Sequence, residues 1–137
     1  MANRKRVGCS ILLVEDDPGV QELLRHVLVD EGNEVEVARN GQEMRAALEA
    51  RIFNVVIMDV RLPGPENGIA LAQQVIERGC GVVLITGDHT YREALEKTGH
   101  RFLLKPFRVE RLLEAAQEVV EEKKARCNVK QGSGRTG

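Results

Sequence analysis

The chain has 137 residues, a length that suits one ordinary domain, and its formal net charge is -1. Because the charge is balanced, there is no basic field to favour nucleic acid as a direct partner. The longest apolar runs, such as 11–14 and 82–85, are too short to span a bilayer, and no apolar segment follows the basic N-terminus. We therefore expect neither a membrane span nor a signal peptide, and a cytoplasmic location.

The three cysteines lie at positions 9, 80 and 127, which are scattered along the chain. This spacing favours free thiols over a disulfide framework or a metal site. Aromatic residues make up only 3% of the chain, so we expect an aliphatic core.

Short apolar runs alternate with amphipathic segments from the start of the chain. The run at 11–14 predicts a first strand, and helical spacing predicts a helix from about 18 to 31, with Pro18 suited to its first turn. The segment 34–38 alternates strictly between charged and apolar residues, which indicates a strand with one wet face near a sheet edge. A second helix is predicted over about 41–50.

The second half of the chain continues the same alternation. The predicted elements are a strand at 55–58 ending at Asp59, a helix at about 69–78, a strand at 82–85, a short helix at about 91–97, a strand at 102–104 and a helix at about 109–124. We interpret 1–8 as an N-terminal extension and 9–124 as the domain. Residues 125–137 are small, polar and basic, and we expect a disordered tail there.

Five strand–helix units in regular order predict an α/β fold with a doubly wound, five-stranded parallel sheet and helices on both faces. Right-handed crossovers leave few arrangements, and the expected strand order is 2-1-3-4-5. This order places the alternating strand 34–38 at an edge.

Polar residues follow four of the predicted strands: Glu15 and Asp16 follow the first, and Asp59, Thr86 and Lys105 follow the third, fourth and fifth. In a doubly wound sheet these strand ends meet at one edge, where ligands bind. We therefore expect these side chains to lie close together, although they are far apart in the sequence.

The chemistry of such a cluster favours a divalent cation. Clustered carboxylates repel one another unless a cation or a proton neutralises them, and an all-oxygen set suits Mg²⁺. Histidine and cysteine are absent from these strand ends, which disfavours zinc. Mg²⁺, Thr86 and Lys105 could each contact one oxygen of a phosphoryl group, with Asp59 as the nucleophile that forms an aspartyl phosphate.

Four segments carry a resemblance to a known family. Because these segments occur together and in this order, the chain resembles the response-regulator receiver domain. The segments are ILLVEDDP at 11–18, VVIMDVRLPG at 55–64, LITG at 84–87 and FLLKPF at 102–107. The resemblance covers nearly all of residues 9–122.

This resemblance implies a role for each matching acid. Asp59 corresponds to the phosphoacceptor and a metal ligand, Asp16 to a direct Mg²⁺ ligand, and Glu15 to a ligand that acts through water. The backbone carbonyl of Arg61 would complete the protein ligands. Asp17 falls outside the acidic pair, and we interpret it as the cap of the helix that starts at Pro18.

The resemblance also implies a switch. Thr86 corresponds to the switch hydroxyl, Phe102 to a switch aromatic that moves inward when Thr86 turns toward phosphate, and Lys105 to the partner of the phosphoryl group. The Lys105–Pro106 peptide is expected to be cis.

The implied function is that of a signalling switch in a two-component phosphorelay, with self-catalysed phosphorylation and dephosphorylation only. The donor would be a sensor histidine kinase or a histidine phosphotransfer protein. The output would pass to a downstream protein through the face formed by helix 4, strand 5 and helix 5, or the chain would be part of a larger regulator or hybrid kinase.

The sequence departs from the family pattern in three places. The loop from Asp59 to Gly68 is one residue longer than usual. The stretch from Thr86 to Lys105 is short, so we expect a clipped or irregular fourth helix. Phe102 stands where tyrosine is commoner.

Two other readings start from the same residues. An Mg²⁺-dependent phosphohydrolase would need a general acid close to Asp59, and Val60 and Arg61 offer none. A flavodoxin would need a phosphate-binding loop after the first strand, where three acids would repel the phosphate, and its FMN would colour the protein.

Arg61 and Asp88 each lie two residues beyond a predicted site residue. We expect them to pair beside the phosphoryl site and to shield it from water, which would prolong the phosphorylated state. An exposed pair of this kind would contribute only about 0–1 kcal/mol to stability.

Overall fold

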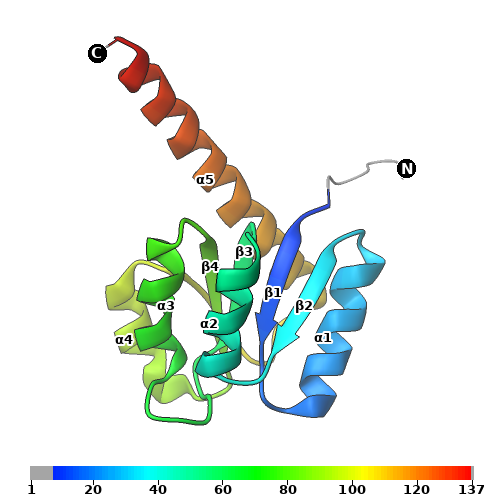
Figure 1. Cartoon of the computed structure of the whole chain (residues 1–137). Helices are drawn as coiled ribbons and strands as arrows, with labels where there is room; N and C mark the ends of the chain where they lie inside the picture. Colours follow the sequence, from blue (N-terminus) through cyan, green and yellow to red (C-terminus); the bar gives the residue numbers. More distant parts are fainter. Residues whose placement is uncertain (1–7, 137) are drawn as a thin grey trace.

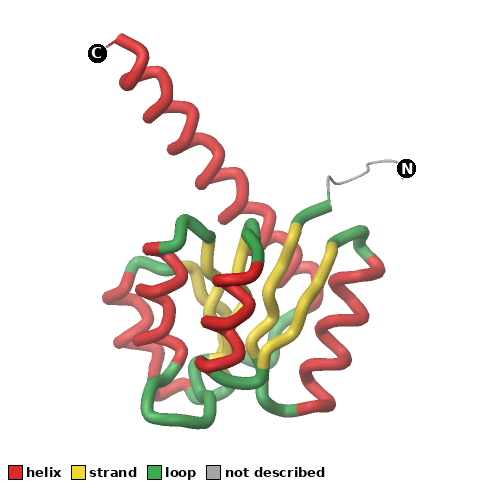
Figure 2. Tube along the Cα trace, in the orientation of Figure 1, coloured by secondary structure: helices red, strands yellow, loops and turns green. Residues whose placement is uncertain are grey.

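The chain folds as a three-layered α/β structure in which a central sheet lies between two layers of helices (Figures 1 and 2). A computed structural model describes residues 8–136, with side chains described for 8–124; residues 1–7 of the expected N-terminal extension lie outside this range. The elements in order are β1 (Ser10–Val14), α1 (Pro18–Asp30), β2 (Glu34–Ala38), α2 (Gly41–Ala50), β3 (Val55–Asp59), α3 (Gly68–Glu77), β4 (Gly81–Thr86), the 3₁₀ turn η1 (His89–Tyr91), α4 (Arg92–Thr98), β5 (Arg101–Leu104) and α5 (Val109–Thr136).

The five strands are parallel and lie in the order β2-β1-β3-β4-β5, which confirms the predicted fold class and topology. β2 is an edge strand, as its alternating sequence predicted. The central strands β3 and β4 are buried at every position because helices cover both of their faces.

Alternate residues of each strand face different helices. One core cluster joins one face of the sheet to α2, α3 and α4, and it includes Leu12, Met58 and Leu84. The other joins the opposite face to α1 and α5, and it includes Leu13 and Ile57. Because every second residue of a strand points the same way, the continuous apolar runs supply both clusters at once.

Local sequence signals set several helix ends. Asp17 Oδ1 accepts hydrogen bonds from the backbone N–H groups of Gly19 (2.9 Å) and Val20 (3.0 Å), which confirms the predicted cap of α1. Asn40 and Asn67 cap α2 and α3 in the same way. The fourth helix is short, as predicted: a 3₁₀ turn leads into the seven residues of α4.

The last helix is longer than predicted. The sequence pattern placed its end near Lys124 and a disordered tail at 125–137, whereas the helical backbone of α5 continues to Thr136 and projects beyond the body of the fold (Figure 1). No proline follows Pro106, so nothing removes a helical N–H donor there, although Gly132 and Gly134 are poor helix formers. In residues 8–136, no helix has both the length and the apolar content to cross a membrane.

Candidate functional site

The carboxyl ends of four strands bring the predicted residues to one edge of the sheet. β1 and β3 are in register up to Val14 and Met58, and β4 and β5 up to Thr86 and Leu104. Asp59 pairs with Ile85 of β4. The residues at or just beyond these ends therefore share one small region, which we call the acceptor site: Glu15, Asp59, Thr86 and Lys105.

Asp59 is the last residue of β3, and it is almost completely buried, with 7% of its surface exposed. Its Oδ1 accepts a hydrogen bond from the backbone N–H of Arg61 at 2.8 Å. Its Oδ2 accepts one from Lys105 Nζ at 3.3 Å. These two donors fix the orientation of the carboxyl group, one on each oxygen.

Glu15 is the second buried carboxyl group, with 2% of its surface exposed. Its Oε2 accepts a hydrogen bond from the backbone N–H of Asp17 at 3.1 Å. Its Oε1 makes no hydrogen bond and lies 3.7 Å from Lys105 Nζ. The pKa of Glu15 is raised to about 7, mainly by burial and also by the nearby Asp59, while the hydrogen bond from the Asp17 N–H and the charge of Lys105 act in the opposite direction.

Two buried carboxyl groups thus share one ammonium group, and one carboxyl oxygen is left without a hydrogen bond. A cation bound between Glu15 and Asp59 would satisfy that oxygen and relieve the repulsion, so the donor set fits a hard divalent ion such as Mg²⁺. The residues present are therefore compatible with the metal that the sequence predicted.

Asp16 does not complete a formed metal centre. Its side chain is exposed, and among the residues whose side chains are described no three acids, histidines or cysteines are gathered into one metal-binding group. Asp16 follows Glu15 directly in the chain, but it is not among the residues that line the hollow beside Asp59.

Lys105 is held by its main chain as well as by its side chain. Its backbone N–H donates to the carbonyl of Thr86 at 2.8 Å, which extends the β4–β5 pairing by one residue. The side-chain stem lies against Gly87, where an added Cβ would be 3.7 Å from Lys105 Cβ. The peptide between Lys105 and Pro106 is cis, which confirms the expectation from the family.

Thr86 ends β4 and is completely buried. Its Oγ1 accepts a hydrogen bond from the backbone N–H of Asp88 at 3.0 Å, so its hydroxyl hydrogen remains available to another acceptor. Arg61 Nη1 lies 3.7 Å from Asp88 Oδ2, which confirms the predicted pair. Both residues line an open hollow together with Asp59 and Lys105.

His89 lines the same hollow, and the sequence analysis did not assign it to the site. Its Nε2 lies 3.0 Å from the carbonyl oxygen of Lys105. The only sequence signal for this contact is that His89 follows Thr86 by three residues at a strand end. Gly68 was also missed: an added Cβ there would lie 2.5 Å from the carbonyl oxygen of Asp59.

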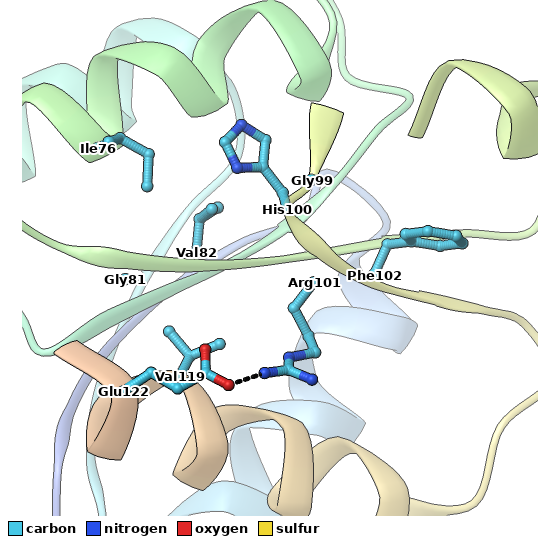
Figure 3. Close-up of a pocket in the computed structure, with 9 residues that line it drawn as sticks. All are labelled: Ile76, Gly81, Val82, Gly99, His100, Arg101, Phe102, Val119 and Glu122. Carbon is cyan, nitrogen blue, oxygen red and sulfur yellow. Dashed lines mark hydrogen bonds and ion pairs between the residues drawn. The ribbon is translucent and has the colours of Figure 1, made fainter. Parts of the chain in front are cut away.

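Phe102 lies away from the acceptor site. It is half-buried and packs against the cluster that joins the sheet to α2, α3 and α4. It also lines a separate hollow at the start of β4 and β5, the opposite edge of the sheet (Figure 3). Figure 3 shows the neighbouring Arg101 pointing to Glu122 of α5. The structure therefore does not bring Phe102 into contact with the reacting groups.

The sequence of this chain is similar to those of known proteins. The sequence matches the response regulator receiver domain over residues 11–117. It is 30% identical to the transcriptional regulatory protein AruR of Pseudomonas aeruginosa over 119 residues, which are 80% of this chain and 48% of AruR. The chain therefore spans about half the length of that relative.

Solved structures share the fold. A CheY-like receiver domain protein of Methanospirillum hungatei is similar with a TM-score of 0.77 and 26% identity, over 88% of this chain and 99% of that one. The response regulator TrrA of Thermotoga maritima, solved in complex with Mg²⁺ and BeF, has a TM-score of 0.73 and 28% identity, over 80% and 97% of the two chains.

Proposed function

Because the chain belongs to the response regulator receiver domain family of two-component systems, we propose that it is a switch that accepts a phosphoryl group on Asp59 with the help of Mg²⁺. One observation carries this proposal. Glu15 and Asp59 are both buried, they share only the Lys105 ammonium group, and Oε1 of Glu15 has no hydrogen bond. TrrA, a similar protein, has been solved with Mg²⁺ and a beryllofluoride group.

The proposed metal ligands are the carboxylates of Glu15, Asp16 and Asp59 and the carbonyl of Arg61, with Glu15 acting through water. Bound there, Mg²⁺ would supply positive charge to the phosphoryl oxygens as the transition state forms. The backbone N–H of Arg61 already fixes one oxygen of Asp59, so the carboxylate is oriented before any ligand arrives.

In the reaction, a carboxylate oxygen of Asp59 forms a bond to phosphorus while the bond from phosphorus to the donor's imidazole nitrogen breaks. The released imidazole takes a proton from solvent. The Lys105 ammonium group would leave Asp59 Oδ2, 3.3 Å away, to pair with a phosphoryl oxygen. The Thr86 hydroxyl, which has a hydrogen to donate, would bind another phosphoryl oxygen.

The switch would follow from that last contact. If Thr86 turns toward phosphate, it gives up its bond to the backbone of Asp88, and the space it leaves would let Phe102 move inward. Phosphorylation would thus shift the balance between two arrangements of β4, α4 and β5. The partner would read this change on the face formed by α4, β5 and α5.

The proposed donor is a sensor histidine kinase or a histidine phosphotransfer protein. AruR is named a transcriptional regulatory protein, and this chain matches only part of it. A nucleic-acid output would therefore belong to a separate domain or partner, since nothing in the acceptor site is built for nucleic acid. The protein would act in the cytoplasm as a signalling switch, with self-catalysed phosphorylation and hydrolysis only.

Arg61 and Asp88 are proposed to modulate hydrolysis. Their pair crosses the open side of the acceptor site, with 69% of the Arg61 side chain exposed. A guanidinium group in this place would hinder the approach of water to the phosphoryl group without contributing much to stability.

The function is tested by transfer from a phosphohistidine. A histidine phosphotransfer protein phosphorylated with ³²P is mixed with this protein, with and without Mg²⁺, and the label is followed by gel. We expect Mg²⁺-dependent transfer to wild type and none to Asp59→Asn. Transfer to Asp59→Asn at the wild-type rate would overturn the assignment of the acceptor.

A further inference from the structure

Lys105 is the only cation in contact with the two buried carboxyl groups among the residues whose side chains are described, so its position matters to any reaction at Asp59. Its Nζ reaches Asp59 Oδ2 at 3.3 Å, close to the upper end of hydrogen-bond distances. A shift of the Lys105 main chain would move the base of the side chain that makes this contact. The groups that hold the Lys105 main chain in place therefore affect where its ammonium group lies relative to Asp59.

Two contacts hold that main chain. On one side, the Lys105 N–H donates to the carbonyl of Thr86 at 2.8 Å. On the other, His89 Nε2 lies 3.0 Å from the carbonyl oxygen of Lys105. The first contact continues the sheet, whereas the second reaches across from the turn after β4 and depends on a single side chain.

The position of His89 is itself fixed. Asp88 precedes the 3₁₀ turn η1, and its Oδ1 accepts hydrogen bonds from the backbone N–H of Thr90 at 3.0 Å and from the Thr90 hydroxyl at 2.5 Å. Asp88 N–H in turn donates to Thr86 Oγ1. A chain of contacts therefore runs from the end of β4 through the turn to the carbonyl of Lys105.

We propose that His89 is a positioning residue for Lys105: its Nε2–H donates to the Lys105 carbonyl and holds the ammonium group where it can pass from Asp59 to an incoming phosphoryl group. This inference rests on the proposed function. His89 does not touch the reacting atoms in this arrangement, so its effect is on geometry.

This role differs from acid–base catalysis in one measurable respect. The neutral ring with its hydrogen on Nε2 and the protonated ring both donate to a carbonyl. The contact is therefore available in both of these ring forms, and the positioning effect should be the same at pH 6 and at pH 8. A general base would lose its benefit when protonated.

The test compares His89→Ala with His89→Gln, whose side-chain amide offers a donor at a similar reach. The matched control is His26→Ala, which removes an exposed histidine of α1 whose Nε2 lies 3.6 Å from Asp30 Oδ2. The rate of adduct formation from acetyl phosphate is measured at saturating Mg²⁺, at pH 6 and pH 8, beside the Mg²⁺ affinity of each protein.

We expect His89→Ala to slow adduct formation about three- to tenfold, the range expected for the loss of one hydrogen bond. The rate for His89→Gln should lie within about twofold of the wild-type rate, because the glutamine amide still offers a hydrogen-bond donor. The rate for His26→Ala should equal that of wild type. The Mg²⁺ affinity should stay within about twofold in all variants, because no proposed metal ligand is changed. An unchanged rate in His89→Ala, or a loss that appears at only one pH, overturns the inference.

A second measurement separates this inference from the proposed function. In protein labelled with ¹³Cε-lysine, the Lys105 signal is assigned by its absence in Lys105→Arg. We expect it to shift in His89→Ala and to stay at its wild-type position in His89→Gln and His26→Ala. If the wild-type protein forms no adduct, the proposed function is wrong. If the Lys105 signal has the same chemical shift in His89→Ala as in wild type, the positioning role alone is refuted.

Discussion

Two charged clusters in this molecule differ in how many cations surround a carboxyl group. In the β5–α5 cluster, Oε1 of Glu118 faces two guanidinium groups, with Arg101 Nη1 at 3.3 Å and Arg111 Nη1 at 3.6 Å. In the acceptor site, the relation is reversed, because the carboxyl groups of Glu15 and Asp59 face the single ammonium group of Lys105.

The two clusters also differ in their access to water. The Glu118 side chain is 45% exposed, whereas the side chains of Glu15 and Asp59 are 2% and 10% exposed. Burying an excess of negative charge is costly unless a cation joins it. Oε1 of Glu118, like Oε1 of Glu15, is buried without a hydrogen bond. Two guanidinium groups lie within 3.6 Å of it, and each of them also pairs with a second glutamate, Glu122 or Glu114. The two carboxyl groups of the acceptor site have only one ammonium group between them, among the residues whose side chains are described.

The largest losses of stability are expected from substitutions of two glycines, one in each region. An added Cβ at Gly68 would lie 2.5 Å from the Asp59 carbonyl oxygen, and one at Gly81 would lie 2.2 Å from Val119 Cγ1 of α5. Each alanine variant should lower the free energy of unfolding by about 1–3 kcal/mol, since tight packing must give way. Urea denaturation measures this loss.

Only one of the two variants should damage the acceptor site. We expect Gly68→Ala to weaken Mg²⁺ binding as well, because the displaced atoms belong to the strand end that carries Asp59. Gly81→Ala should bind Mg²⁺ like wild type. Gly19→Ala serves as a control, since a Cβ there would meet its nearest atom, Asp17 Oδ1, at 3.4 Å. Equal Mg²⁺ affinities in Gly68→Ala and Gly81→Ala would contradict this account.

The next effect concerns the stability of the metal-free protein. The folded-state pKa of Glu15, about 7, lies above the ordinary value of 4.5 expected in the unfolded chain. Folding therefore favours the protonated carboxyl group. This contribution is fully present below pH 4.5 and is lost as the pH rises through 7, because the buried charge must then be tolerated.

Glu15→Gln should therefore be more stable than wild type at pH 8 without Mg²⁺, by about 1–3 kcal/mol. The gain should shrink toward pH 5, where wild-type Glu15 is largely protonated. The same variant should bind Mg²⁺ more weakly. Thermal unfolding at pH 5 and 8 gives the comparison, and a Glu15→Gln variant that is less stable at pH 8 would show that the buried charge is already compensated.

A smaller effect of opposite sign is expected in the β5–α5 cluster. Glu118→Gln removes a charge that faces two guanidinium groups, so it should destabilise the protein by about 0.2–1 kcal/mol. Mg²⁺ affinity should not change. A stabilising Glu118→Gln, measured by urea denaturation, would remove the contrast between the two clusters.

The smallest effect on stability is expected for Arg61→Ala, within about 0.5 kcal/mol of wild type, because its pair with Asp88 is exposed. The lifetime of the aspartyl phosphate should nevertheless shorten, since water gains access to the site. Arg39→Ala, which removes an exposed ion pair of 3.1 Å between the turn before α2 and Glu43 of that helix, is the matched control. An unchanged lifetime in Arg61→Ala would refute the shielding role.

The sequence predicted most of the fold because its signals are local. Apolar runs that end in Glu15, Asp59, Thr86 and Lys105 are visible without any tertiary information, and the parallel topology then forces those ends together. The cap at Asp17 follows from the same kind of short-range pattern.

What the sequence did not predict depends on contacts between distant residues. The bond from His89 to the carbonyl of Lys105 requires both the 3₁₀ turn and the end of β5 in place, and the close approach of Gly68 to Asp59 leaves no trace in composition. The length of α5 was missed because residues 125–137 are small, polar and basic, a composition that was taken to favour disorder. Asp16 is exposed although its neighbour Glu15 is buried, because successive residues at a strand end point in different directions.

The most direct test of the central claim is the intact mass of the protein after treatment with acetyl phosphate, with and without Mg²⁺. We predict an added mass of one phosphoryl group that requires Mg²⁺ and is lost in Asp59→Asn, with the β5–α5 variant Glu118→Gln labelled like wild type. If no adduct forms with Mg²⁺ present, or if Asp59→Asn is labelled equally, the buried carboxyl pair is not a phosphoacceptor site.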